Sequence, residues 1–548
     1  MLKLRCGPTS SAASKGTFEK TLTLSLIVAL GIAAGLTVLY ATAWAPWAGS
    51  DSVEYLEAAR NLAGGRGLVT IRASGNVVPL YARPPLYSLV LAAMIRQGLD
   101  PVGGVRLLNA VGLATLIGLV GFSIRRATAH LLLPVMAAVF VLADVGVLDS
   151  FSGLMSEPLF LLLVVGQLVS LEVYLSGGKP WILWLSAILA ALALLTRFAG
   201  AACIVVMAVA VVGWGKGPLR KRVGLAIASS FLATLPFLLW TGSLLSQGHT
   251  PGVYRLDLAT ARQSFGSARI SLLDTLWGWF PWLAPLAGIA YRAKLAVTAI
   301  LLGLGLVSLG WVARRRAADR GRNGRAALLL GGLFAGFSLA HAAVVSAAYV
   351  FVRFPRPALD ERVLLPSYVT MVLGLALLGW YLLAPLARQI PASVFVLLLL
   401  APIVVSSLQP AQAWLTAMHA DGRGYTGRGW NGLEILAVLN RLPPAAPLVS
   451  NDIDAVTFFA ERPAFRLPDL EERIAEAEWR PFGQTRHSLA EREFADDGGY
   501  LVLFSSALGQ LADIYGSRAG ARLDSLVAGL KIVYEGNDGR IYSRQDAP

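Results

Sequence analysis

The sequence predicts a polytopic α-helical membrane protein that carries a small α/β domain at its C-terminal end. Of its 548 residues, 56% are hydrophobic and only 15% are charged, and the mean hydropathy is +0.62. A soluble protein of this length is rarely so apolar. Many apolar segments are long enough to cross a bilayer as helices. By contrast, residues 410–548 hold most of the charged residues of the later part of the chain and several short strand-like runs.

The first element is a basic tail, residues 1–20, followed by an apolar run over 21–40. This run is too long for the apolar core of a cleaved signal peptide, and no clear small-residue cleavage site follows it. We therefore expect a retained membrane anchor. The chain's cysteines, Cys6 and Cys203, form neither a disulfide framework nor a zinc site.

We expect about eleven membrane spans in a domain that covers residues 21–409. Each is an apolar run bounded by polar or basic residues. The segments are 21–44, 104–124, 129–148, 157–175, 181–195, 198–214, 223–245, 287–312, 326–349, 363–383 and 391–408.

The distribution of basic residues predicts the orientation of these spans. With a cytoplasmic N-terminus, the inner loops carry Arg125, Arg126, Lys179, Arg388 and the basic clusters of 216–222 and 314–325. The outer loops, including the first loop 45–103, carry most of the acids and tryptophans. Cytoplasmic loops are enriched in Lys and Arg, so the net charge of +14 reflects topology, and we expect no nucleic-acid binding.

Two outer segments are too short or too irregular to span a membrane. Residues 86–97 are predicted to form a helix that lies at the membrane interface. Residues 274–286, rich in tryptophan and proline, are also typical of the interface.

Residues 410–548 are predicted to form an extracytoplasmic α/β domain. The runs APLVSND, GYLVLFSS and KIVYEG indicate buried strands, and DAVTFFAER and 519–529 indicate helices. Asp452 or Asp454 precedes one of these helices and either caps it or contributes to a cation or sugar site.

The first outer loop holds the strongest candidates for chemistry. Asp51 follows the first span directly, and Glu54 and Tyr55 come after it at helical spacing. A carboxylate there can accept a proton from an acceptor hydroxyl or ligate a divalent cation. The alternative is an ordinary solvated acid of a surface loop.

The pattern D-x-x-x-Y-x-x-x-A-x-x-L-x-x-G-x-G, followed by the R-P-P-L-Y run that contains Arg83, resembles the first external loop of C-type glycosyltransferases. It is most similar to the bacterial branch related to protein O-mannosyltransferases and the lipid A aminoarabinose transferase. The resemblance implies that Asp51 is an active-site aspartate. In that family a second acid often stands beside it, but here the position is Ser52.

A second match, S-E-P-L-F, places Glu157 where the family has an acid that faces the first-loop aspartate. Glu157 would then share a divalent metal ion with Asp51, or divide the work of base and positioning group with it. A stabilising interaction with the helix dipole is the alternative.

Two arginine motifs complete the resemblance. Arg197, in an L-T-R element, interrupts an apolar stretch, and such a charge indicates either a functional site or a hairpin at the outer surface. Glu361 and Arg362 resemble the family's E-R-Y-L-x-P element, with Val363 in place of tyrosine. The resemblance implies that Arg197 and Arg362 bind the carrier phosphate, since guanidinium groups pair with phosphate oxygens.

These features predict a cytoplasmic-membrane glycosyltransferase that moves a sugar from a polyprenyl-phosphate donor to a glycan, lipid or protein acceptor on the outer face. The candidate catalytic residues, or ligands of a divalent metal, are Asp51 and Glu157, and the candidate substrate-binding residues are Glu54, Tyr55, Arg83, Arg197, Glu361 and Arg362. A transporter or flippase of a lipid-linked saccharide, or a non-catalytic cell-envelope assembly protein, is the alternative.

Overall fold

The structure is a computed structural model that describes residues 10–71, 77–251, 261–279, 292–295, 322–352, 359–383, 392–467, 498–506 and 526–544, with residues 494, 509, 516 and 524. It divides into two compact parts. We call them the helical part (Met1–Ala43, Tyr81–Tyr87 and Val105–Ala420) and the sheet part (Trp44–Leu80, Ser88–Gly104 and Asp421–Pro548).

The helical part confirms the prediction of a multi-pass membrane protein. Within the described ranges, 7 helices are long and apolar enough to cross a bilayer. They are α1 (Ser10–Ala41), α4 (Pro101–Thr128), α7 (Glu157–Leu175), α10 (Leu219–Ser246), α13 (Arg322–Phe351), α14 (Glu361–Leu383) and α15 (Ala392–Asp421).

One further pair of helices is bent and forms either a broken span or a re-entrant loop. Helices α5 (Leu132–Ala143) and α6 (Val145–Phe151) meet at an angle of 63°. Asp144 stands at the break in an extended conformation, and its Oδ1 accepts a hydrogen bond from the backbone N–H of Val147 at 2.9 Å. The side chain thus satisfies an N–H that has no partner within α6, which is the usual role of an N-cap.

Shorter helices complete the helical part. They are α8 (Trp181–Thr196), the 3₁₀ turn η1 (Phe198–Gly200), α9 (Ala201–Trp214) and α11 (Ala261–Gly278). Helix α3 (Leu86–Arg96), which corresponds to the expected interfacial helix, belongs to the sheet part from Ser88 onward. The expected segment 287–312 falls almost entirely outside the described residues, as does most of 274–286. Every other predicted span coincides with a helix or with the broken pair.

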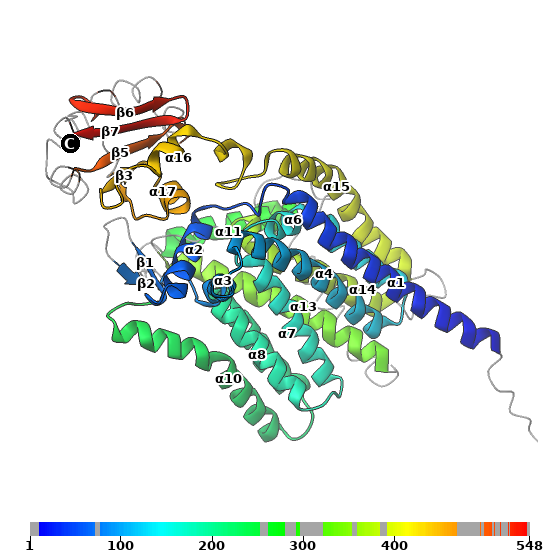
Figure 1. Cartoon of the computed structure of the whole chain (residues 1–548). Coiled ribbons are helices and arrows are strands. Elements are labelled where there is room, and N and C mark those ends of the chain that lie inside the picture. The colour runs from blue at the N-terminus through cyan, green and yellow to red at the C-terminus, as the bar shows by residue number, and fades with distance from the viewer. Residues whose placement is uncertain are drawn as a thin grey trace, which may run out of the picture. The chain divides into compact units, whose positions relative to one another are not determined.

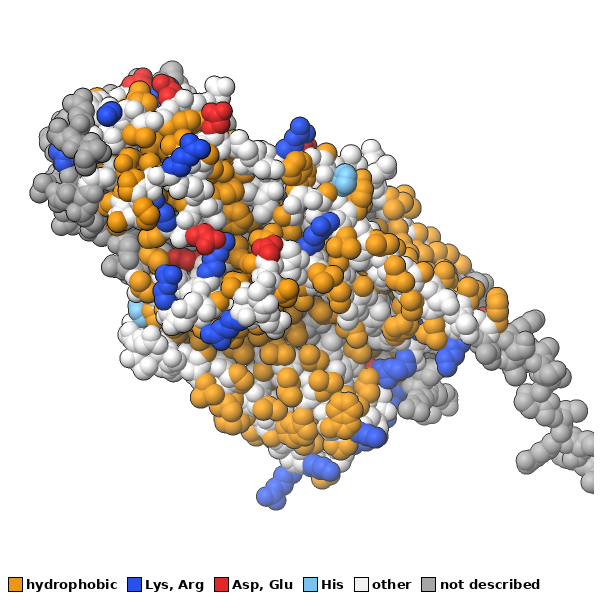
Figure 2. Space-filling view, viewed as in Figure 1, with side chains coloured by type: hydrophobic (Ala, Val, Ile, Leu, Met, Phe, Trp, Pro, Cys, Tyr) orange, Lys and Arg blue, Asp and Glu red, His pale blue; other side chains and the backbone are white. Residues whose placement is uncertain are grey.

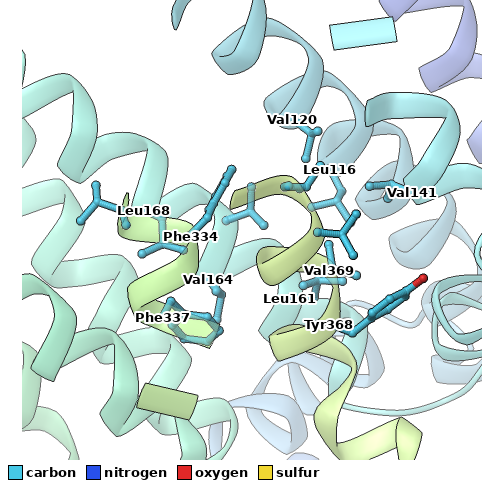
Figure 3. Close-up of a cluster of buried hydrophobic side chains, with 14 of the residues drawn as sticks. Leu116, Val120, Val141, Leu161, Val164, Leu168, Phe334, Phe337, Tyr368 and Val369 are labelled. Atoms are coloured by element: carbon cyan, nitrogen blue, oxygen red, sulfur yellow. The ribbon is translucent and has the colours of Figure 1, made fainter. Parts of the chain in front are cut away.

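The core of the helical part lies between helices that are distant in sequence (Figure 3). Leu161, Val164 and Leu168 of α7 pack in one cluster with Phe334 and Phe337 of α13. The same cluster takes in Leu116 and Val120 of α4, Val141 of α5, and Tyr368 and Val369 of α14. The helix that begins at Glu157 is therefore held by several neighbours.

The sheet part contains a five-stranded sheet in the order β4-β3-β5-β7-β6 (Figure 1). The strands β3 (Leu448–Ser450), β5 (Tyr500–Phe504) and β6 (Leu530–Gly536) are those predicted from the sequence. The strands β4 (Phe465–Arg466) and β7 (Gly539–Arg544) were not predicted. Strand β3 pairs in parallel with β4 and β5, and β7 is antiparallel to β5 and β6.

Alternate residues of the central strands face two different clusters. Leu448, Val502 and Phe504 pack with α16 (Glu434–Leu439) and α17 (Ile453–Ala460), while Val449 and Leu501 belong to the cluster on the other face. Strands buried on both faces read as continuous apolar runs, which explains why these runs were recognisable in the sequence.

The start of the first loop belongs to the sheet part. It forms α2 (Ser50–Ala63) and an antiparallel hairpin of β1 (Val69–Ile71) and β2 (Val77–Pro79). The backbone N–H of Tyr425 donates to Ala48 O at 2.9 Å, and Arg60 pairs with Glu461 at 2.8 Å. Helix α15 runs on to Asp421, where the last segment of the sheet part begins.

Candidate active site

Glu157 stands at the first position of α7, at the start of a predicted membrane span. Ser156 precedes the helix and Pro158 follows within its first turn; proline suits this position because its fixed φ matches the helix and its missing N–H needs no partner. Only 5% of the Glu157 side chain is exposed. A buried carboxylate requires charged or hydrogen-bonding partners.

Two arginines from other segments supply these partners. Arg197 Nη1 lies 2.7 Å from Glu157 Oε1, and Arg362 Nε lies 3.5 Å from the same oxygen. Arg197 also donates to Ser156 Oγ at 3.2 Å. Three motifs that are far apart in sequence therefore meet in one cluster, which we call the Arg–Glu–Arg cluster (Glu157, Arg197 and Arg362).

The local structure explains how each arginine reaches this cluster. Arg197 lies between the end of α8 and η1 in an extended conformation, with φ −148° and ψ 140°. Arg362 stands in the first turn of α14, where Asp360 Oδ1 accepts the N–H of Val363 at 2.9 Å and so caps the helix. The Arg362 side chain is 42% exposed and that of Arg197 is 22% exposed, so solvent or a ligand can reach both.

A buried histidine contacts residues of the same region. His341 of α13 is 1% exposed. Its Nδ1 lies 2.8 Å from Ser367 Oγ of α14, and its ring packs against those of Phe160 and Phe337. Phe160 is the last residue of the S-E-P-L-F motif, so His341 supports the helical turn that carries Glu157.

Glu361 faces a different space from its neighbour Arg362. It lines a cavity of about 320 Å³ together with Asp144 and Tyr368. Ser406 and Ser407 of α15 also line it. A small cavity with several hydroxyl and carboxylate groups suits a polar, hydroxyl-rich ligand.

The candidates Asp51, Glu54 and Tyr55 lie on α2, in the sheet part. Asp51 and Glu54 are partly exposed, while Tyr55 is 2% exposed. Ser52, at the position where the family often has a second acid, is fully buried, and its Oγ accepts the backbone N–H of Gly49 at 3.0 Å. Its role is to cap α2. Arg83 lies with the helical part and is partly exposed.

The sequence matches no protein-family model and no curated protein. Among solved structures, the chain is similar to ArnT from Cupriavidus metallidurans bound to undecaprenyl phosphate, with a TM-score of 0.52 and 15% identity over 94% of this chain and 97% of that one. It is also similar to the arabinofuranosyltransferase AftD from Mycobacteria, with a TM-score of 0.50 and 14% identity over 95% of this chain but only 39% of that one. The chain has the C-type glycosyltransferase fold.

Within this C-type fold, Glu157 does not have the surroundings of a metal ligand. Two guanidinium groups stand within 4.0 Å of it, and such cations oppose the approach of a divalent metal ion. In the part of the chain that the structure describes, no group of three His, Cys, Asp or Glu side chains could hold a metal. We therefore derive no step through a metal ion at Glu157.

His341 and the cavity beside Glu361 were not predicted from the sequence. His341 had a usable signal, because a histidine in the middle of an apolar span is expensive and indicates a function or a partner. The cavity had none, since its lining residues come from α6, α11, α14 and α15, and only the packing of these helices brings them together.

Proposed function

We propose that this chain is a membrane glycosyltransferase that transfers a sugar from a polyprenyl-phosphate donor to an acceptor at the outer face of the cytoplasmic membrane. The observation that carries the proposal is the Arg–Glu–Arg cluster at the ends of predicted spans. Accessible guanidinium groups at the ends of membrane spans can bind the phosphate of a lipid carrier while the tail of the carrier remains in the bilayer.

The charge distribution supports an outward-facing cluster. Glu157 begins α7, and Lys179 follows the other end of the same helix. Arg125 and Arg126 stand in the last turn of α4, and Arg126 pairs with Glu172 in the last turn of α7. The basic end of these spans is thus opposite to the end that carries Glu157, which under the positive-inside rule supports a cluster at the outer face and an N-terminus in the cytoplasm.

The reaction that we propose is a displacement at the anomeric carbon of the sugar. Asp51 accepts the proton of the acceptor hydroxyl while the oxygen of that hydroxyl forms a bond to the anomeric carbon. The bond between that carbon and the phosphate oxygen breaks, and the polyprenyl phosphate leaves with the electron pair. Arg197 and Arg362 stabilise the charge that develops on the leaving phosphate.

In this scheme Glu157 is a positioning residue. It holds the two guanidinium groups in fixed orientations, so that they need not reorganise when the leaving group gains charge. The cavity that Glu361 lines with Asp144 and several hydroxyl groups binds the sugar or the acceptor in this scheme. Glu54, Tyr55 and Arg83 are further substrate-binding candidates from the resemblance of the first loop.

The similarity to ArnT supports the choice of donor, since that protein was solved with undecaprenyl phosphate bound. A lipid-linked donor also suits a site at the outer face, where nucleotide sugars are not expected. The sugar and the acceptor are not specified by any of these features.

The experiment is an assay of sugar transfer from synthetic polyprenyl-phosphate donors by the purified full-length protein. Asp51→Asn should lower the rate by about 100-fold or more, the range of a lost general base. Arg362→Gln should lower it by a similar factor through loss of leaving-group stabilisation. Asp421→Asn is the matched control, because Asp421 is a carboxylate with a 69% exposed side chain and only a 3.9 Å contact with Arg428.

Equal rates for wild type and Asp51→Asn would refute the assignment of Asp51. Donor flipping without transfer in proteoliposomes would favour a transporter or flippase. If activity in cells survived Asp51→Asn but was lost on deletion of the chain after Asp421, a non-catalytic assembly protein would be the better description.

A further inference from the structure

The end of the helical part opposite to the Arg–Glu–Arg cluster contains a further cavity. A cavity of about 250 Å³ lies between the turn that joins α7 to α8 and the turn that joins α9 to α10. Its walls include Tyr174, Leu183, Trp184 and Leu225, and two lysines, Lys216 and Lys221, line it. The proposed transfer reaction uses none of these residues.

The two turns bring the lysines to the cavity. Gly177 has φ +103°, a conformation that favours glycine, and a Cβ at this position would lie 2.8 Å from the Nζ of Lys216. The ammonium group of Lys216 therefore lies directly over the backbone of the α7–α8 turn. Lys221, in the first turns of α10, lines the same cavity from the other connection.

Arg222 and the pair of Glu172 with Arg126, in the same region, have protein partners. Arg222 Nη1 donates to the carbonyl oxygens of Val212 and Gly213 at the end of α9, at 2.7 and 3.2 Å. Glu172 is fully buried and pairs with Arg126. Among the residues that the structure describes, neither Lys216 nor Lys221 has a carboxylate within 4.0 Å. The cavity therefore presents two positive charges.

The surroundings indicate that the ligand is a lipid. Trp181, Trp184 and Trp214 are exposed near the cavity, and tryptophan side chains mark the depth of the lipid headgroups. Beyond the cavity, α10 exposes apolar side chains such as Val223, Ile227 and Phe231. Figure 2 shows Lys and Arg side chains gathered at this end, next to a broad hydrophobic surface.

We propose that this cavity binds the headgroup of an anionic phospholipid. Lys216 and Lys221 contact the phosphate, the indole of Trp184 lies at headgroup depth, and the acyl chains lie along the exposed apolar face of α10. Basic pockets between membrane helices are a known way to recognise anionic lipid headgroups. The proposal does not depend on the transfer reaction or on which side of the membrane this end faces.

Lipid retention by the full-length protein tests the proposal. After delipidation in detergent, the protein is incubated with dioleoylphosphatidylglycerol or dioleoylphosphatidylcholine, and the retained lipid is counted by native mass spectrometry. Wild type should retain the anionic lipid in preference to the zwitterionic one. The double variant Lys216→Gln with Lys221→Gln should weaken this retention by about 25-fold, because each lysine contributes roughly a factor of five.

Two further variants separate the cavity from general surface charge. Lys179→Gln with Arg220→Gln removes the same charge from exposed positions at the same end that do not line the cavity, and it should retain the lipid as wild type does. Lys216→Arg with Lys221→Arg keeps both charges and should retain most of the binding. Size-exclusion profiles of all variants confirm that each is folded.

Several outcomes would overturn the proposal. Equal weakening in both double-glutamine variants would mean a diffuse electrostatic effect. Equal retention of the two lipids by wild type would mean no recognition of charge. Full competition by millimolar glycerol 1-phosphate would identify a soluble phosphate compound as the ligand in place of a lipid.

Discussion

The Arg–Glu–Arg cluster predicts that its two arginines contribute very unequally to the stability of the helical part. The perturbation is Arg197→Gln compared with Arg362→Gln, each removing one guanidinium group from Glu157. Because both substitutions remove the same charge from the same carboxylate, a difference between them reflects distance, burial and the additional hydrogen bond of Arg197 to Ser156 Oγ.

The structure gives the expected magnitudes. Arg197 approaches Glu157 to 2.7 Å, and the side chains are 22% and 5% exposed. Removing one partner of such a buried pair costs about 3 kcal/mol, the lower end of the range for buried pairs. Arg362 stands at 3.5 Å with 42% exposure, so solvent screens it and its loss costs about 0.5 kcal/mol.

The chain supplies its own reporter for this measurement. Cys203 is fully buried in α9, so a thiol-reactive fluorophore labels it only when the helical part opens. With Cys6→Ser in every protein, the midpoint of labelling on heating measures unfolding in detergent. Arg197→Gln should lower this midpoint by several degrees, and Arg362→Gln by about one degree or less.

A double-mutant cycle then isolates the pair. Glu157→Gln combined with Arg197→Gln should be less damaging than the sum of the two single changes, by about 2 kcal/mol, because either change alone leaves a charge without its partner. Additive effects, or equal losses from the two arginine variants, would show that the 2.7 Å pair does not hold this region together.

Three further predictions concern the sheet part. Burial raises the pKa of the Glu57 carboxyl from its usual 4.5 to about 7. The folded state is therefore destabilised as the pH rises from 4.5 to 7, because the unfolded chain ionises more readily there. Glu57→Gln should match wild type in thermal stability near pH 4 and be more stable than wild type by about 2 kcal/mol above pH 8. Asp452→Ala removes the oxygen that accepts the N–H of Ala455 at 2.9 Å, and should cost about 1 kcal/mol in thermal unfolding; a loss below the error of the measurement would contradict the cap. Gly424→Ala places a Cβ 2.0 Å from Ala48 O and should speed limited proteolysis of the first loop, whereas Gly429→Ala, with open space around its Cβ, should not.

The sequence predicted the elements of this fold better than the assembly of its site. The span that starts at Glu157 and the strands around Val449 and Leu501 were recognisable because each is a continuous apolar run with clear boundaries. Strand β7 (Gly539–Arg544) was missed, since GRIYSR contains only Ile541 and Tyr542 as large apolar residues and shows neither a continuous apolar run nor a sustained polar–apolar alternation. Its place in the sheet comes from pairing with β5 and β6, which is tertiary information.

The motifs around Glu157, Arg197 and Arg362 were each identified, but nothing in their spacing reveals that one carboxylate oxygen contacts both arginines. That arrangement depends on the extended residue between α8 and η1 and on the cap of α14. Ser52 illustrates the reverse case. The sequence showed only that an acid was absent there, and the hydrogen bond from Gly49 gives the physical reason why a serine is suited to this position.

The pairing of the first loop with the last segment of the sheet part (Asp421–Pro548) has a consequence for biosynthesis. Thr426 Oγ1 donates to Pro46 O across 380 residues of sequence, at 2.8 Å. A ribosome makes the N-terminal segment first, so the loop that carries Asp51 leaves the membrane long before its packing partners exist. A chain whose synthesis ends before Thr426 can insert its membrane spans, but its first loop lacks the residues that it packs against. The first loop can therefore reach its final structure only after the last segment has been made.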